Sequence, residues 1–203
     1  MSTTPFKPLN PEDQRHFLLR KLHSLTGIVP IGCFLIEHML TNSRAFPWFE
    51  WFPSGPGAFN EAVHFLHKLP FLPFLELFGI FLPLAFHAGY GLVIAWQGQS
   101  NVGQYPHLDN VRYRLQRIAG YIAVVFLIIH LLKFRFAHLI GWGPEFIGSP
   151  NPYEITRHGL TAWRPCGVVV PVWLTFLMYW IGLAAACFHF GNGIWSFCIT
   201  WGL

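Results

Sequence analysis

Long runs of apolar residues, separated by polar or turn-rich segments, divide this chain into alternating parts. Four runs stand out, at about 22–40, 69–95, 118–132 and 167–190. A helix needs about 20 predominantly apolar residues to cross a bilayer, and the segment 111–117 extends the third, shorter run as helix. The pattern predicts an all-α, polytopic membrane bundle with four transmembrane helices, forming a single domain over 1–203. The last residues, after 190, have the character of the start of a fifth helix.

The segments between these runs predict different structures. Residues 58–68 have the spacing of a short amphipathic helix lying on the membrane surface, with Phe59, Val63 and Leu66 on one face. Residues 97–108 predict a polar connection, and the Gly- and Pro-rich stretch from 133 to 165 predicts a long loop. Within the second run, Pro83 predicts a kink.

Composition agrees with the membrane assignment. Hydrophobic residues make up 53% of the chain and charged residues only 11%, whereas soluble domains are about 25% charged. The net charge of +4 comes from scattered Lys and Arg that form no basic stripe, so nucleic acid is not an expected partner. The four cysteines lack a CxxC spacing and are interpreted as small apolar residues. No short apolar stretch typical of a signal peptide precedes the first run, which we interpret as a retained span.

The positive-inside rule gives an orientation. One side of the membrane receives seven basic residues in short segments close to the spans: Lys7, Arg15, Arg20, Lys21, Arg112, Arg114 and Arg117. The other side receives six in longer loops: Arg44, Lys68, Lys133, Arg135, Arg157 and Arg164. We therefore expect the N-terminus in the cytoplasm.

Four histidines lie inside the apolar runs, one in each: His38, His87, His130 and His189. An imidazole in hydrocarbon is costly, so such residues point to function. His38 comes 16 residues after Leu22, roughly 24 Å along a helix, and His130 lies well into its outward-running span. Both should lie in the outer half, and the other two in the cytoplasmic half. Depth thus pairs His38 with His130 and His87 with His189, as axial ligands of two low-spin b haems.

The alternative for any single one of these histidines is a hydrogen-bonded packing residue. Glycines near the ligands, which would allow close approach of helices or a macrocycle, are Gly27, Gly89, Gly91, Gly120, Gly191 and Gly193. His23, at the cytoplasmic mouth of span one, could bind a propionate or a quinone, or could simply face the headgroups. Candidate polar groups for a quinone site near the outer haem are Glu37, Glu76, His64 and His67. Candidate propionate partners are the basic residues Arg20, Lys21, Arg112, Arg117, Arg44, Lys133 and Arg135.

Several segments give the chain a family resemblance. RKLHSLTGIVPIGCFLIEH (20–38), LPFLPFLELFGIFLPLAFHAGYG (69–91), VGQYPHLDNVRYRLQRIAGYI (102–122) and HFGNGIWSFCITWGL (189–203) resemble the cytochrome b membrane anchor of bacterial succinate:menaquinone reductases and fumarate reductases. The likeness is greatest to the single-anchor, di-haem type of bacilli.

The resemblance implies a cytoplasmic-side haem on His87 and His189 and an outer haem on His38 and His130. It implies flavoprotein and iron–sulfur partner subunits, menaquinone as electron acceptor, and a place in the bacterial cytoplasmic membrane. Members of this family usually have five spans, and some fumarate reductases carry a glutamate where this chain has Cys187. A proton route through that glutamate is therefore not expected here.

Three other functions fit parts of the pattern. A di-haem cytochrome b of a membrane hydrogenase or formate dehydrogenase would receive its electrons from the opposite side. A transporter with a histidine-lined path should show inverted repeats and interrupted helices, which the sequence does not suggest. A haem-free structural anchor would lack b-type absorption bands.

Overall fold

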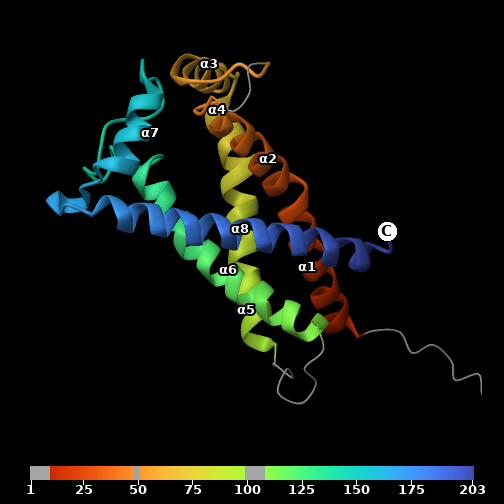
Figure 1. Ribbon diagram of the computed structural model, residues 1–203. Coiled ribbons are helices and arrows are strands. Elements are labelled where there is room, and N and C mark those ends of the chain that lie inside the picture. The colour runs from red at the N-terminus through yellow and green to blue at the C-terminus, as the bar shows by residue number, and fades with distance from the viewer. Residues whose placement is uncertain (1–9, 48–50, 99–107) are drawn as a thin grey trace, which may run out of the picture.

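The computed structural model describes residues 10–47, 51–98 and 108–203, and the regular structure in these residues is helical (Figure 1). Most of the expected polar connection 97–108 lies outside the described residues. Four helical segments are long and apolar enough to cross a membrane: Pro11–Ser43, Leu72–Gln97, Asn110–Lys133 and Val172–Trp201. The all-α, polytopic fold expected from the sequence is confirmed, but the expected start of a fifth helix after residue 190 is instead a continuation of the fourth segment, a single helix over Val172–Trp201. The first and third segments begin earlier than the apolar runs that predicted them, because helices continue into polar sequence where caps and packing support them. The second and fourth segments begin a few residues later than predicted and end later.

The first span consists of α1 (Pro11–Ile28) and α2 (Pro30–Ser43). It begins well before residue 22 because Asn10 caps the polar first turn, its side chain accepting a hydrogen bond from the Asp13 amide at 2.7 Å. The two helices meet at Val29, directly before Pro30, which has no amide hydrogen to continue the ladder. The break was not predicted, although Pro30 inside the run was its signal.

The second span comprises α4 (Leu72–Glu76), a π-helical turn η1 (Leu77–Phe81) and α5 (Leu82–Gln97). The sequence placed a kink at Pro83, and the structure has its irregular turn immediately before that proline. A π-helical turn adds a residue to the helical repeat and rotates the side chains on either side of it relative to one another. Glu76 therefore lies at the junction between two differently wound segments.

Two short helices lie at the same end of the molecule (Figure 1). The amphipathic helix expected at 58–68 is α3 (Pro56–His67), with Phe59 and Val63 buried. The second, α7 (Pro152–Thr161), falls where the sequence predicted a loop. Asn151 caps it by accepting from the Glu154 amide at 3.2 Å, so the Asn-Pro-x-Glu sequence was an unused helix-start signal. The two helices are joined by the Tyr153 amide donating to the Asn60 side chain at 2.8 Å.

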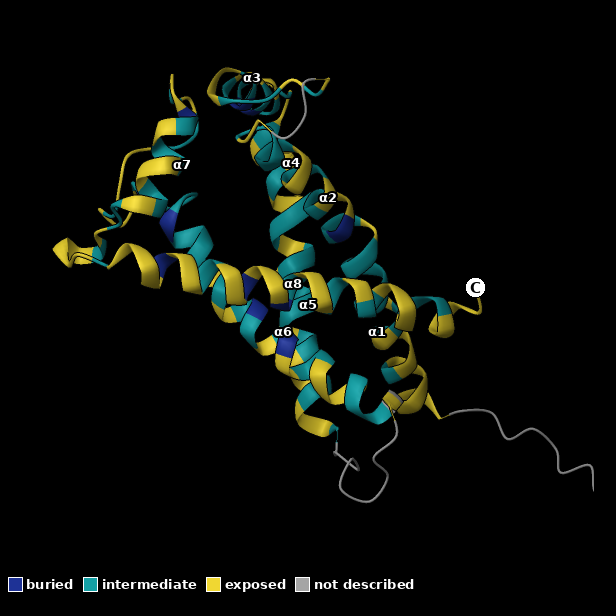
Figure 2. Ribbon diagram, in the orientation of Figure 1, coloured by how far each residue is buried: buried dark blue, intermediate teal, exposed yellow. Residues whose placement is uncertain are grey.

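The third span, α6 (Leu108–Lys133), packs most extensively against α8 (Val172–Trp201), which crosses the other long helices in the view of Figure 1. Small residues line this contact: Ala119 and Ala123 on α6 and Ala185 on α8 are buried, and Gly182 on α8 lies against the Phe126 ring. Small side chains let membrane helices approach closely. Much of α8 is exposed (Figure 2). Large apolar side chains on it, such as Trp173 and Trp180, are exposed, as lipid-facing residues are.

Candidate functional site: two pairs of facing histidines

The first pair of histidines joins α5 to α8. The imidazole rings of His87 and His189 have centroids 6.1 Å apart and are nearly perpendicular, at 88°. His23, from α1, stacks on His87 with centroids 4.1 Å apart and an angle of 11°. The sequence left open whether His23 binds a propionate or a quinone or faces the headgroups, and the structure stacks its ring on the ligand candidate His87.

Backbone carbonyls hold the two rings of this pair in place. His87 Nδ1 lies 2.9 Å from the carbonyl oxygen of His23, and His189 Nδ1 lies 3.1 Å from that of Gln116. A carbonyl can only accept, so each Nδ1 must carry the proton. This fixes the tautomer in which Nε2 has a free lone pair, and a metal-binding histidine needs that tautomer.

Two glycines provide the room for these rings. A Cβ atom on Gly27 would lie 2.5 Å from His87 Cε1, and a Cβ on Gly120 would lie 3.0 Å from His189 Cε1. A Cβ at Gly27 would force the His87 ring to move, and one at Gly120 would make a tighter contact than most side chains show. By contrast, a Cβ on Gly89 or Gly191 would meet nothing within 4 Å.

A polar network connects α6 to α8 around His189. Gln116 Nε2 donates to the carbonyl of His189 at 3.0 Å, and Asn192 Nδ2 donates to Gln116 Oε1 at 3.1 Å. Arg112 donates to Asn192 Oδ1 through Nε at 3.2 Å and Nη2 at 2.9 Å. The LQRIAG and HFGNGIWSF segments therefore meet in space, and their polar side chains fix the position of the His189 backbone.

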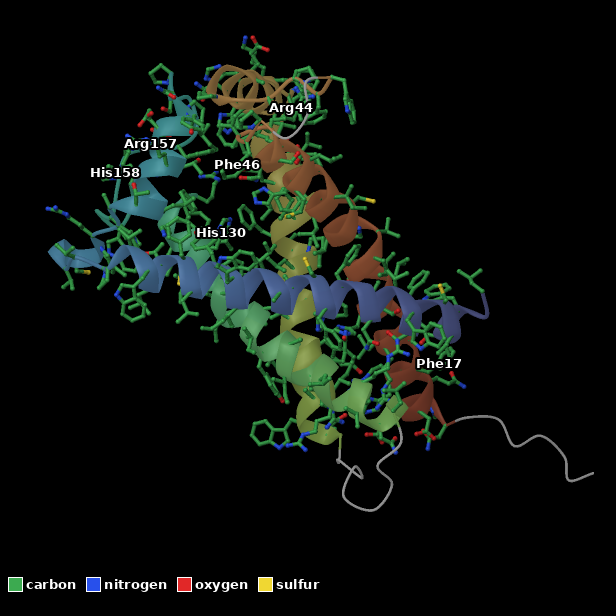
Figure 3. All side chains as sticks on the ribbon, in the orientation of Figure 1. Phe17, Arg44, Phe46, His130, Arg157 and His158 are labelled. Atoms are coloured by element: carbon green, nitrogen blue, oxygen red, sulfur yellow. The ribbon has the colours of Figure 1, made fainter. Side chains whose placement is uncertain are left out.

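The second pair lies nearer the end that carries α3 and α7. The rings of His38, on α2, and His130, on α6, have centroids 5.8 Å apart at 85°. His130 Nδ1 lies 3.2 Å from the hydroxyl of Tyr179 on α8. Figure 3 marks His130 on the part of α6 between its crossing with α8 and α7. The structure thus brings together the same pairs that depth along the sequence grouped.

The spacing within both pairs suits a metal ion held between two imidazoles. With metal–nitrogen bonds of about 2.0–2.1 Å, two rings ligating one ion from opposite sides have centroids about 6 Å apart. The described residues contain no cluster of three or more ligating side chains of the kind that holds a bare metal ion. A six-coordinate haem needs only two ligands from the protein, and a pair of histidines supplies them.

The four quinone candidates divide into two groups. Glu37 accepts from the Thr41 hydroxyl at 2.6 Å on its own helix, and His64 Nε2 lies 3.0 Å from the Ser149 carbonyl. Glu76 pairs with Arg135 through two bonds, Nη2 to Oε2 at 2.8 Å and Nε to Oε1 at 3.1 Å. His67 has a buried Nδ1 without a hydrogen-bond partner among the residues that the structure describes.

His67 shares the electrostatic environment of that ion pair. Burial lowers the pKa of its imidazole, with His64 and Arg135 acting in the same direction and the Glu76 carboxylate opposing them. His67 and Glu76 therefore belong to one polar cluster near the end that carries α3, whereas Glu37 is engaged elsewhere.

Three contributors to these sites were not identified from the sequence. Gln116 and Asn192 carried no signal beyond being polar residues within helical segments. Tyr179 did carry one, because a tyrosine hydroxyl in an apolar span needs a hydrogen-bond partner. Its position ten residues before His189 gave no indication that the partner would be His130, on another helix.

The fold and these sites define a multi-pass helical membrane protein with two pairs of facing histidines. The chain is 39% identical over 189 residues to the succinate dehydrogenase cytochrome b558 subunit of Bacillus subtilis (strain 168). The alignment covers 93% of this chain and 82% of that protein. The chain belongs to the family of succinate dehydrogenase cytochrome b subunits, as its sequence segments indicated. No family model and no solved structure matches it significantly.

Proposed function

We propose that this chain is the membrane anchor and electron-transfer subunit of a succinate:menaquinone oxidoreductase. The observation that supports this most is the presence of two histidine pairs at different depths of a four-span bundle. Within each pair the ring centroids are about 6 Å apart. His87 and His189 hold one b haem on the cytoplasmic side, and His38 and His130 hold a second on the outer side. Two b haems supply one-electron carriers between an iron–sulfur centre at the cytoplasmic face and menaquinone near the outer face.

The surrounding residues keep the ligands in the correct state for this role. Carbonyl oxygens of His23 and Gln116 keep the Nδ1 atoms of one pair protonated, and the Tyr179 hydroxyl bonds one ring of the other. These bonds fix ring orientation and set the basicity of each imidazole. Gly27 and Gly120 leave space for the rings against the backbone.

Menaquinone reduction takes up two electrons and two protons, so its site needs groups that exchange protons. The cluster of Glu76, Arg135 and His67 lies near the outer pair and provides a carboxylate and an imidazole. We propose these residues as the polar side of the quinone site. Succinate itself is oxidised in a flavoprotein partner, and an iron–sulfur partner docks on the cytoplasmic face, where the N-terminus also lies.

The test combines spectroscopy with selective ligand changes. A reduced-minus-oxidised spectrum of the purified chain should show low-spin b-type bands equivalent to two haems per chain. His87→Ala or His189→Ala should remove the cytoplasmic-side haem and leave the outer one, and His38→Ala or His130→Ala should do the reverse. His158→Ala, on the exposed face of α7, is the control and should keep both.

Absence of b-type bands would exclude the cytochrome function. Loss of both haems from a folded single-histidine variant would contradict the pairing. Mass-spectrometric identification of soluble subunits that copurify with the chain tests the partners. A flavoprotein and an iron–sulfur protein are expected, whereas a hydrogenase or formate dehydrogenase subunit would replace this proposal with the alternative.

A further inference from the structure

Lys133, the last residue of α6, carries a buried charge with no acceptor. The residue is only 5% exposed, and its Nζ atom has no hydrogen-bond partner among the described residues. It follows His130 by three residues, so both side chains leave α6 on the same side. A buried ammonium group without a partner is strongly destabilising. Such a group in a folded protein indicates that its surroundings bind an anion.

Aromatic rings surround this ammonium group. Nζ lies 4.4 Å from the ring centroid of Trp163, 4.8 Å from that of Tyr179 and 5.6 Å from that of Phe134. Gly159 of α7 closes one side, where a Cβ would lie 3.6 Å from Lys133 Cε. The faces of aromatic rings attract a cation, but they replace only part of the water that burial removes. They also offer no oxygen for the three N–H bonds of the ammonium group.

Two further unpartnered polar groups lie on the elements around this cage. Trp163 Nε1 is buried without an acceptor in the part of the chain that the structure describes, and its ring is the nearest of the three to Lys133 Nζ. The Thr175 hydroxyl likewise has no partner in that part of the chain, and Thr175 is only 1% exposed. Thr175 lies one helical turn before Tyr179, on the same face of α8. All three groups can donate hydrogen bonds, so an anionic oxygen ligand is the chemistry they share.

Two other basic residues of this part of the chain lie in different surroundings. Arg135 is committed to Glu76 through two hydrogen bonds, and the Arg44 guanidinium lies over the Phe52 ring at 5.4 Å. Lys133 differs from both because it is buried next to an outer-side ligand. Its ammonium group also lies over the ring of Tyr179, whose hydroxyl contacts His130.

We propose that Lys133, together with Trp163 Nε1 and the Thr175 hydroxyl, binds a propionate carboxylate of the outer haem. The inference rests on the proposed function, since it requires a haem on His38 and His130. A positive charge beside the carboxylate keeps it ionised and favours the reduced haem, which carries one negative charge more than the oxidised form. Lys133 is in this sense a positioning and tuning residue, and not an iron ligand.

The experiment is a redox titration of each haem in the full-length, haem-loaded chain, followed by visible and EPR spectra at several pH values. Lys133→Met should lower the equilibrium constant for reducing the outer haem about tenfold. This is the size expected when one charge is removed from a partly buried position near the haem. For one electron this is about 59 mV. The potential should also vary more steeply with pH, because the carboxylate then takes up a proton on reduction. Lys133→Arg should keep most of the wild-type potential.

The cytoplasmic-side haem serves as an internal reference and should not change. Lys68→Met is the matched control, because it removes the same charge from an exposed position on the same side. Full outer-haem content in Lys133→Met with unchanged potential and pH dependence would overturn the proposal and leave an aromatic cage only. The wild-type chain should keep its outer-haem potential when lipid is removed. If the potential changes in a lipid-free preparation and returns when phosphatidylglycerol is added, the pocket is instead assigned to a lipid phosphate.

Two smaller changes decide the matter if Lys133→Met does not fold. Thr175→Val keeps the shape and removes the hydroxyl, and Trp163→Phe keeps an aromatic face and removes Nε1. Each should lower the outer-haem potential in the same direction by a smaller factor, and unchanged potentials in both would overturn the proposal. A wild-type chain without an outer haem would contradict the proposed function itself, which is a separate outcome.

Discussion

The Nδ1 atom of His87 lies 2.9 Å from the backbone carbonyl oxygen of His23, on a different helix. The contact fixes which ring nitrogen of His87 carries the proton and leaves Nε2 with a free lone pair. His23 therefore contributes to the site of His87 and His189 through its main chain, while its own imidazole stacks on His87 with ring centroids 4.1 Å apart. Replacement of the His23 side chain need not remove this hydrogen bond.

Gly27→Ala should weaken binding of the cytoplasmic-side haem. The new Cβ would lie 2.5 Å from His87 Cε1, so the imidazole has to move. Displacing the support of a metal ligand commonly costs 10–100-fold in affinity, and we expect a loss of about that size. Haem titration of the apoprotein, with outer-haem occupancy as reference, measures it. Gly89→Ala is the control, because its Cβ meets nothing within 4 Å; equal loss in both variants would contradict the steric explanation.

Tyr179→Phe should raise the midpoint potential of the outer haem. The Tyr179 hydroxyl lies 3.2 Å from His130 Nδ1, and a hydrogen bond given by Nδ1 makes the imidazole a stronger donor toward ferric iron. Without that bond the oxidised form is less stabilised. The direction is opposite to that expected for Lys133→Met, and optical redox titration distinguishes the two. Tyr121→Phe, on an exposed part of α6, should change neither haem.

Glu76→Gln should destabilise the protein by about 1–3 kcal/mol, between the values typical of exposed and buried pairs. The side chains of Arg135 and Glu76 are 28% and 15% exposed, so the pair is only partly screened by solvent. Chemical unfolding in detergent, followed by far-UV circular dichroism, measures the change. The double variant Glu76→Leu with Arg135→Leu should recover part of the loss, because no charge then remains unpaired. Purely additive losses would show that the two residues do not interact.

Acidification should destabilise the protein partly through His67. Burial lowers the pKa of His67 below its ordinary value of 6.5. Because the folded-state pKa is depressed, the stabilising contribution is complete above about pH 6.5 and is lost as the pH falls below that value. The unfolding temperature should therefore drop less steeply below pH 6.5 in His67→Phe, which keeps a ring against Phe146. Identical slopes in the two proteins would contradict this origin.

The apolar pattern was sufficient to predict four helical spans and the amphipathic helix that contains Phe59 and Val63, because burial in lipid selects for composition over long stretches. Local signals for helix starts and helix breaks predicted less of the structure. The break before Pro30 and the helix capped by Asn151 both had sequence signals, yet neither was predicted. Hydrogen-bond partners from distant segments, such as Tyr179 for His130, could not be predicted from spacing at all.

The sequence by itself determined the membrane-spanning fold, the family and the grouping of four histidines by depth. These properties follow from composition, helix rise and short motifs, which are local. Only the tertiary structure decided how His23, Gly27 and Gln116 support the ligands and that Arg135 is already paired with Glu76. It also decided that Lys133 is buried with no acceptor within 10–47, 51–98 and 108–203. Each of these depends on the rotation and crossing of helices about their axes, and side-chain packing between distant segments sets both.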